Sequence, residues 1–298
     1  MSSQKPKVYF TKTISSEKIV EMFKILHKDL PGKVAVKVHS GEKGNQNFLH
    51  PEFLRNMVDY VQGTIVECNT AYGGARMTTD SHKQVMKEHE WTKYFKVDIL
   101  DAEGPDDELE IPNGYILKKT YVGKNMKNYD SALVLSHFKG HGSGGYGGAL
   151  KQLSIGFGST AGKCLQHTGG QSTDTNDFRS KKCGAKEFKE TMADAASAVV
   201  KFFKGNMAFI NMMVNISMDC DCDGNARPPC MADIGILSST DPVALDQACL
   251  DLIYNSKDEG KKELIERIEG LYGPHIIECS VELGTGKKEY ELIHIKQI

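Results

Sequence analysis

The sequence predicts an α/β fold with a mostly parallel sheet, helices on both faces and an inserted hairpin region. Short apolar runs rich in β-branched residues alternate with segments whose apolar side chains recur at helical spacing. Strand–helix–strand alternation of this kind favours parallel strands joined by right-handed crossovers. The length of 298 residues suits one large domain, 1–298, or two intimate lobes near 1–130 and 131–298.

The first half of the chain predicts strands and helices in alternation. Ile19, Val20, Phe23 and Leu26 recur at helical spacing, and Pro31-Gly32 ends that helix. The predicted strands cover residues 7–10, 34–39, 64–67 and 97–100, and the predicted helices cover residues 16–28, 51–62 and 79–88. Polar loops at 40–47 and 68–77 lie between them.

The second half begins differently. Residues 109–122 resemble a hairpin that turns at Pro112-Asn113-Gly114. The apolar strand 131–136 precedes a Gly-rich segment, 137–148, and the polar stretch 169–184 reads as a surface excursion. Further predicted elements are a helix at 185–204, strands at 207–216 and 234–237, a helix that starts at Asp241-Pro242, another helix and two C-terminal strands.

Composition excludes several classes of partner. The 37 Lys and Arg nearly balance the 39 Asp and Glu, so the net charge of -2 does not favour nucleic acid. Apolar runs fall short of the roughly 18 residues that a membrane helix needs. Met1–Lys7 is polar and no apolar segment follows it, so we expect a cytoplasmic protein with mostly reduced cysteines. The oligomeric state is left open.

Residues that suit a ligand site follow four of the predicted strands. His39 follows one strand, Glu67-Cys68-Asn69 the next, His137 and His141 a third, and Asp219-Cys220-Asp221-Cys222 a fourth. In open α/β sheets, ligands bind beyond the carboxyl ends of the strands. If these strands share one sheet, their ends form one shared site.

Cysteines and histidines in this set predict a metal site. Cys220 and Cys222 are two residues apart and Cys230 follows, and thiolates with imidazoles favour Zn or Fe over Mg or Ca. The candidate metal ligands are His39, His137, His141, Asp219, Cys220 and Cys222. The alternative is a polar loop with reduced thiols and no metal.

Other polar residues nearby suit catalysis and substrate binding. Glu42 lies three residues after His39, and Glu42 or Asp233 could act as a general base, although either carboxylate could instead cap or pair. Arg76 is suited to gripping a carboxylate or phosphate. The candidate substrate-binding residues are Asn69, Tyr72, Arg76 and Lys139. The Gly-rich segments match neither common nucleotide-binding motif.

Four segments in order resemble the family called domain of unknown function 362. They are Val36–Asn45, Glu67–Gly74, Ser136–His141 and Asp233–Ala248, and the resemblance spans nearly the whole chain. Members of this family are often labelled iron–sulfur centre proteins, and many carry an inserted ferredoxin-like cassette. Here the corresponding stretch, Thr168–Ala185, holds only Cys183, and a cubane cluster generally needs four thiolates. A 4Fe–4S cassette is therefore not expected.

Three hypotheses follow. The first is a metal-dependent enzyme or redox-associated protein that acts on a small anionic molecule, with a divalent Zn or Fe as Lewis acid or redox centre. The second is a metal-binding module that is not catalytic. The third is a protein-interaction domain whose Cys and His residues are structural. An enzyme requires an open coordination position, whereas a structural site is closed by four protein ligands.

Overall fold

The computed structural model describes residues 4–104 and 106–296. The strands are β1 (Lys7–Thr11), β2 (Val34–Lys37), β3 (Thr64–Glu67), β4 (Val97–Ile99), β5 (Asp107–Glu110), β6 (Lys119–Val122), β7 (Ser131–His137), β8 (Lys139–His141), β9 (Gly145–Gly147), β10 (Met207–Met213), β11 (Gly235–Ser239) and β12 (Glu291–His294). The helices are α1 (Ser16–Lys24), α2 (Pro51–Val61), α3 (Thr79–Glu88), α4 (Trp91–Tyr94), α5 (Ala149–Lys151), α6 (Thr160–His167), α7 (Asp177–Ser180), α8 (Ala185–Phe202), α9 (Pro242–Tyr254), α10 (Lys261–Gly270) and α11 (His275–Glu282), with a 3-10 turn η1 (Lys124–Asn128) and a π-helical turn η2 (Gln152–Gly156).

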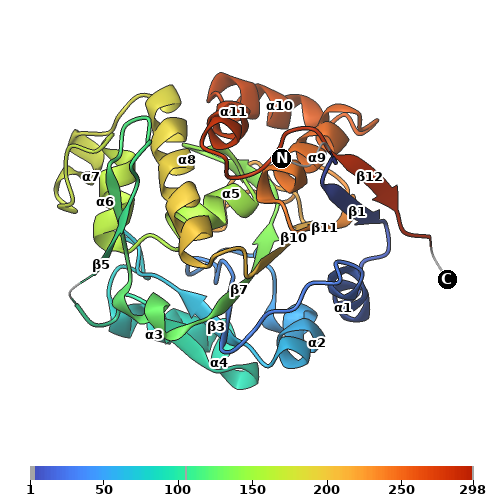
Figure 1. Ribbon diagram of the computed structural model, residues 1–298, viewed down its shortest axis with the longest axis horizontal. Helices are drawn as coiled ribbons and strands as arrows, with labels where there is room; N and C mark the ends of the chain where they lie inside the picture. Colours follow the sequence, from blue (N-terminus) through green and yellow to red (C-terminus); the bar gives the residue numbers. More distant parts are fainter. Residues whose placement is uncertain (1–3, 105, 297–298) are drawn as a thin grey trace.

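A mostly parallel sheet of eight strands runs through the molecule, as the sequence predicts (Figure 1). Its order is β12-β1-β11-β10-β7-β2-β3-β4, and the five strands from β10 to β4 are parallel to one another. β11 is antiparallel to both β10 and β1. The carboxyl ends of β10, β7, β2 and β3 therefore lie side by side at one edge of the sheet.

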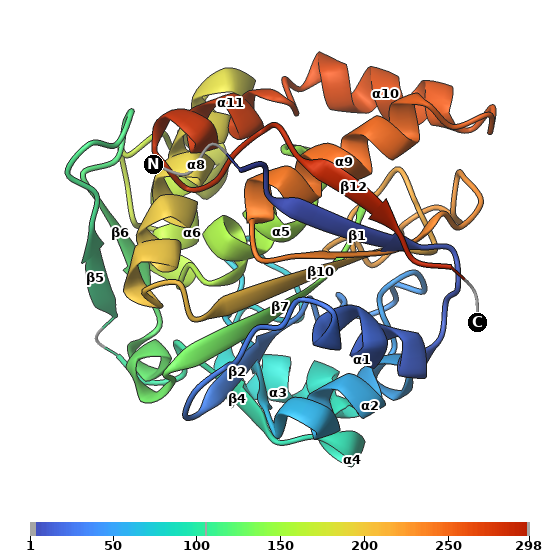
Figure 2. The same cartoon turned by 45° about the vertical axis from the view of Figure 1, so that its right-hand side comes forward.

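Helices cover both faces of this sheet, and each face has its own core. Helices α1 to α4 lie on one side, and α5, α8, α9 and α11 lie on the other (Figure 2). Ile19, Leu54 and Trp91 belong to the first core, whereas Phe188 and Leu245 belong to the second. Burial on both faces explains why β7 and β10, which are buried along their whole length, consist mostly of apolar residues.

The inserted hairpin forms where the sequence predicts it. β5 and β6 pair antiparallel, with Glu110 opposite Lys119. The polar stretch 169–184 contains the short helix α7 and has no fully buried residue.

The prediction of two C-terminal strands was wrong, because the described end of the chain contains α10, α11 and the single strand β12. Leu264 and Ile268 are buried one helical turn apart in α10, a period that belongs to a helix.

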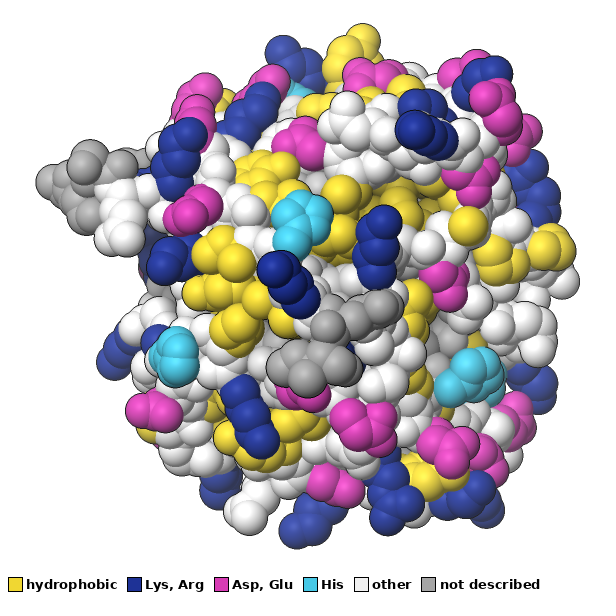
Figure 3. Space-filling model, turned by 90° about the vertical axis from the view of Figure 1, so that its right-hand side faces the viewer, with side chains coloured by type: hydrophobic (Ala, Val, Ile, Leu, Met, Phe, Trp, Pro, Cys, Tyr) yellow, Lys and Arg dark blue, Asp and Glu magenta, His cyan; other side chains and the backbone are white. Residues whose placement is uncertain are grey.

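The outer surface carries charges of both signs. Figure 3 shows acidic and basic side chains mixed over one face, in keeping with the net charge of -2. Within residues 4–104 and 106–296, the helices lack the combination of length and apolar character that a membrane span requires. Of the polar N-terminal segment Met1–Lys7, residues 1–3 lie outside the described part of the chain.

A buried carboxylate fixes the start of α5 against α9 and β10. Asp246 is fully buried and accepts hydrogen bonds from the backbone N–H groups of Ala149 (2.8 Å) and Leu150 (2.9 Å). It also accepts a bond of 2.7 Å from Asn211 Nδ2. Burial raises the pKa of Asp246 to about 6. The segment that begins at Ala149 carries part of the candidate site, so Asp246 links the fold to the site.

We expect the Asp246→Ala substitution to lower the free energy of unfolding by about 2 to 4 kcal/mol, because it leaves three buried donors without an acceptor. Denaturant titration at pH 7 measures this loss. Glu266→Ala, an exposed position on α10, is the control and should leave the unfolding midpoint close to that of the wild type. A variant as stable as the wild type would show that the three donors find other partners.

Candidate functional site

A cavity of about 510 Å³ opens at the carboxyl edge of the parallel strands. His39 follows β2, Glu67 ends β3, and His141 follows β7 through the short strand β8. Cys220 and Cys222 come from the loop after β10. The four strand ends that carry the predicted residues therefore share one cavity.

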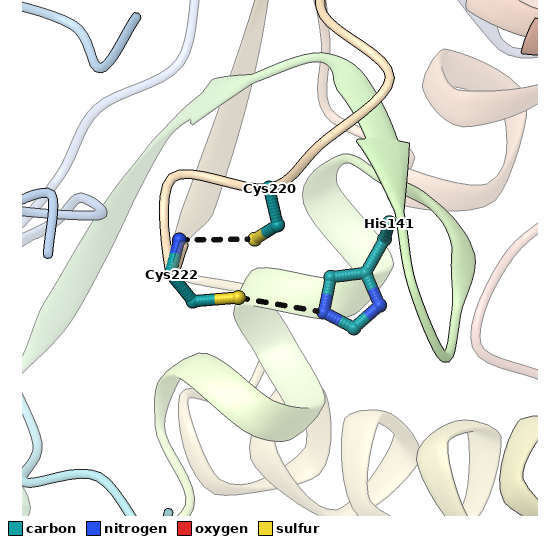
Figure 4. Close-up of side chains that lie close together, drawn as sticks. All are labelled: His141, Cys220 and Cys222. Atoms are coloured by element: carbon teal, nitrogen blue, oxygen red, sulfur yellow. Dashed lines mark hydrogen bonds between the residues drawn. The ribbon is translucent and has the colours of Figure 1, made fainter. Parts of the chain in front are cut away.

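Three of the predicted metal ligands form one cluster on the cavity wall. One ligand atom from each of His141, Cys220 and Cys222 lies within 4.8 Å of the other two. Cys222 Sγ is 4.0 Å from His141 Nε2, and Cys220 Sγ accepts a hydrogen bond of 3.4 Å from the Cys222 N–H (Figure 4). The two sulfurs and the ring point into the same space.

The backbone fixes the orientation of the His141 ring. His141 Nδ1 accepts hydrogen bonds from the N–H groups of Gly144 (2.6 Å) and Ser143 (3.1 Å). A neutral imidazole whose Nδ1 accepts carries its proton on Nε2. The Nε2–H group of His141 therefore faces the sulfurs.

Lys151 brings a positive charge to the cluster. Its ammonium donates a hydrogen bond of 3.2 Å to Cys220 Sγ. Burial raises the pKa of Cys220, but the hydrogen bond from Cys222, the charge of Lys151 and the hydrogen bond from His141 outweigh burial and hold the pKa well below its usual value. Cys220 is thus the thiolate of the pair.

Asp221, between the two cysteines, anchors their loop to the sheet. It is fully buried and contacts His137 Nδ1 at 2.8 Å and Lys139 Nζ at 2.7 Å. The other ring nitrogen of His137, Nε2, lies 2.7 Å from the carbonyl oxygen of Val214. Both nitrogens of His137 are therefore engaged by protein, and the charge of Lys139 is paired with a carboxylate.

A second buried network lies around Glu67. Its carboxylate contacts Lys37 Nζ at 2.7 Å and Arg76 Nη1 at 3.3 Å. Burial raises the pKa of Glu67, but the charges of Lys37 and Arg76 outweigh burial and hold the pKa well below 4.5. Glu42 accepts hydrogen bonds from Tyr72 Oη (3.0 Å) and the Ala75 N–H (2.8 Å) and lies 3.5 Å from Arg76 Nε.

His39 lies between the two networks. Its Nε2 is 3.4 Å from Arg76 Nη2, its Nδ1 accepts a hydrogen bond of 3.2 Å from the Gly41 N–H, and the same nitrogen is 4.0 Å from Asp221. Burial and the charge of Arg76 lower the pKa of His39 to about 4. The ring is neutral at pH 7 and lines the cavity beside the cluster.

Of the remaining predicted residues, Asp219 lines the cavity, whereas Asn69 and Asp233 do not. Asp219 pairs with Arg227 at 3.1 Å. Asn69 is buried, contacts His82 and Thr79, and does not line the cavity. Asp233 is exposed and accepts a hydrogen bond from the Asn215 N–H, so the structure does not bring it to the cavity. The roles assigned to these residues stay predictions.

The sequence analysis assigned no role to several charged and imidazole residues of the cavity wall. Three of them are Lys151, Lys163 and His167, which line the cavity from α5 and α6. The spacing of Lys163 and His167 by one helical turn could have drawn attention to these two residues, because it places both on one helix face.

The comparisons with known proteins establish the family. The model of a family described as a domain of unknown function, DUF362, matches residues 34–251, which is more than half of the chain. The chain therefore belongs to this family. No curated protein matches it.

Two solved structures are similar in parts of their fold. The lactate racemase apoprotein from Thermoanaerobacterium thermosaccharolyticum has 12% identity and a TM-score of 0.48, covering 82% of this chain and 56% of that one. A protein from Thermotoga maritima has 10% identity and a TM-score of 0.39, covering 90% of this chain and 59% of that one. The chain thus matches less than two thirds of the length of either structure.

We expect Glu67→Gln to lower the free energy of unfolding at pH 7 by about 3 to 5 kcal/mol, because it leaves two buried cations without their carboxylate. The folded pKa of Glu67 is depressed, so its contribution is complete above pH 4.5 and is lost as the pH falls below that value. The difference between wild type and variant should therefore shrink below pH 4.5. Denaturant titrations at several pH values measure it.

The control for this prediction is Glu88→Gln, which removes the exposed ion pair with Lys43. It should leave the unfolding midpoint near that of the wild type at every pH. A Glu67→Gln variant that behaves like this control would contradict the importance of the buried network.

Proposed function

We propose, for a chain whose family is described only as a domain of unknown function, that it binds a divalent zinc or iron ion and acts on a small anionic molecule. The observation that carries the proposal is the convergence of His141, Cys220 and Cys222 on the wall of one cavity. Thiolate and imidazole ligands suit Zn or Fe better than Mg or Ca. The ion would supply Lewis-acid or redox chemistry at this wall.

The number of ligands favours a reactive site over a structural one. A closed zinc site uses four protein ligands, whereas a catalytic site uses three and leaves one position open. Only these three residues of the described chain form a group of this kind. The open cavity beside them leaves room for a substrate.

The charge beside the cluster favours an anion. Lys151 contacts Cys220 and also lines the cavity, so a bound anion would meet a positive charge next to the ion. Two thiolates neutralise the charge of a divalent cation. The positive charge of Lys151 is then available to attract an anionic substrate.

His141 fits the ion less well than the two cysteines do. Binding through Nε2 requires the ring proton to leave that nitrogen, and Nδ1 already accepts two backbone hydrogen bonds. Moving the proton to Nδ1 would break both bonds. His141 is therefore expected to be the weakest of the three ligands.

We expect protein purified without oxygen, affinity tag or chelator to hold about one zinc or iron per chain. Cys220→Ser and Cys222→Ser should each weaken metal affinity by roughly 100-fold or more, since even outer partners of metal ligands contribute about 10- to 100-fold. His141→Ala should weaken it less. Elemental analysis and competition with a chromogenic chelator measure these changes.

The matched control is Cys230→Ser, on the same loop but outside the cluster, where its thiol contacts the carbonyl oxygen of Ile216. It should keep the full metal content. Folded, colourless protein without metal under these conditions would refute the metal proposal.

A second candidate function is thiol chemistry without a metal. The specific observation in its favour is that His141 Nε2–H and Lys151 both face the sulfurs, an arrangement that stabilises a thiolate. Cys220 would then be the nucleophile, and Cys222 the neighbouring thiol that can resolve a mixed disulfide.

For this candidate we expect Cys220 of the metal-free, reduced protein to react with iodoacetamide about tenfold faster at pH 7 than in a Lys151→Met variant, because the variant loses the charge that stabilises the thiolate. Peptide mass spectrometry follows the rate at Cys220. Lys182→Met, at an exposed lysine of the cavity rim, is the control. Equal rates in wild type and Lys151→Met would argue against a lysine-stabilised nucleophile.

A further inference from the structure

The cations that the sequence predicts for anion binding are already paired inside the protein. Arg76 contacts the carboxylates of Glu42 and Glu67, and Lys139 contacts Asp221. Each of these carboxylates would compete with an incoming anion. Anion recognition in this cavity therefore calls for a cation that has no carboxylate partner.

Lys163 is such a cation. It lines the cavity, is only 7% exposed, and donates a hydrogen bond of 2.5 Å from Nζ to the carbonyl oxygen of Gly158. Among the described residues, no carboxylate oxygen lies within 4.0 Å of its ammonium group. A buried ammonium group without a carboxylate in direct contact is costly. A bound anion would remove that cost.

A buried hydroxyl without a partner lies on the same wall. Thr70 lines the cavity and is 3% exposed, and its Oγ1 has no hydrogen-bond partner among the described residues. The carbonyl oxygen of Thr70 accepts a hydrogen bond of 3.5 Å from Thr160 Oγ1. Thr160 lies three residues before Lys163 on α6, so this contact brings Thr70 to the helix face that carries Lys163.

His167 extends this wall by one helical turn. Its ring lines the cavity and stacks against Phe178 and Phe188, with ring centroids 4.5 Å and 4.3 Å away. No hydrogen bond to its ring nitrogens is found among residues 4–104 and 106–296. Burial, together with nearby cations that include Lys182 and Lys151, holds the pKa of His167 well below its usual value. The ring is a neutral hydrogen-bonding group.

We propose that Lys163, Thr70 and His167 form an oxyanion subsite, which holds the carboxylate or phosphate group of a small ligand in the cavity that contains the cysteine cluster. Lys163 supplies the charge, and Thr70 and His167 supply hydrogen bonds. The subsite deepens the proposed function, and its part in any reaction rests on that function. Binding of the anion itself requires no metal.

The test uses full-length, reduced protein freed of metal with a chelator. Inorganic phosphate and acetate are titrated separately at constant ionic strength, and the rise in the unfolding midpoint gives the affinity. We expect one of the two anions to bind wild-type protein, and Lys163→Gln to weaken that binding roughly tenfold or more, because a charged hydrogen bond is lost. Thr70→Val should weaken it by a smaller factor.

Lys182→Gln is the matched control, since this exposed lysine also lines the cavity. It should bind as the wild type does, which separates a built subsite from general positive charge. If Lys163→Gln does not fold, Lys163→Arg, which keeps the charge, and Thr70→Val carry the test: the first should retain binding and the second should lose part of it. Phosphate binding identifies a phosphate-bearing ligand, and acetate binding identifies a carboxylate.

The inference is overturned if neither anion stabilises the wild-type protein, or if Lys163→Gln and Thr70→Val respond to the anion as the wild type does. Because metal is absent from this experiment, its result is independent of the metal proposal. If the protein binds an anion but never binds metal, the oxyanion subsite is supported and the metal proposal is refuted. If the protein binds metal but neither anion, the metal proposal is supported and the oxyanion subsite is refuted.

Discussion

The candidate site depends on the burial of one carboxylate, Asp221. The loop after β10 would be free to take many conformations if its only constraints were its two ends. Instead, Asp221 is completely buried and meets His137 and Lys139 from the end of β7. Burial raises the pKa of this carboxyl, but the charges of His137 and Lys139 outweigh burial and hold the pKa well below its usual value. A buried charge is tolerated only with such partners, so these contacts restrain the loop.

That closure determines where the cysteines lie. Cys220 and Cys222 flank Asp221, and the carbonyl oxygen of Asp221 accepts a hydrogen bond of 2.7 Å from the Glu42 N–H. The loop after β10 is thereby tied to the loop after β2 as well as to β7. The cysteine sulfurs lie near His141 because neighbouring parallel strands bring their ends together.

The sequence predicted which strand ends come together, but it did not predict which protein groups each residue contacts. Parallel pairing places the residues after strands at one edge, and this rule brought His39, Glu67, His141 and the cysteines to one cavity. It does not say which polar groups satisfy one another. His137 and Arg76 look like ligand-binding residues in the sequence, yet each is engaged by buried protein groups. Pairings across long sequence separations depend on the tertiary fold, so local patterns do not reveal them.

The strand-end rule considers only the loops that follow strands, so it did not identify Lys151, Lys163 and His167, which lie on helices. These residues belong to two neighbouring helical segments, 149–156 and 160–167, that pack beside the cavity. Two glycines allow this close packing. A Cβ at Gly148 would lie 2.5 Å from Asp246 Oδ1, and a Cβ at Gly156 would lie 2.9 Å from Lys37 Cε.

The close approaches at Gly148 and Gly156 help to position two cations of the cavity wall, Lys151 and Lys37. Gly148 lets Asp246 receive the N–H groups that open α5, and α5 carries Lys151. Gly156 ends the π-helical turn beside Lys37, whose ammonium bonds Glu67 and the carbonyl oxygen of Val38. Lys37 is therefore directed into the protein, whereas Lys163, one α6 turn beyond Ser159, forms no ion pair with a carboxylate of the described chain. Glu67 and Asp219 on the cavity wall are paired with Arg76 and Arg227, so neither carboxylate balances the charge of Lys163, and an anionic ligand would do so.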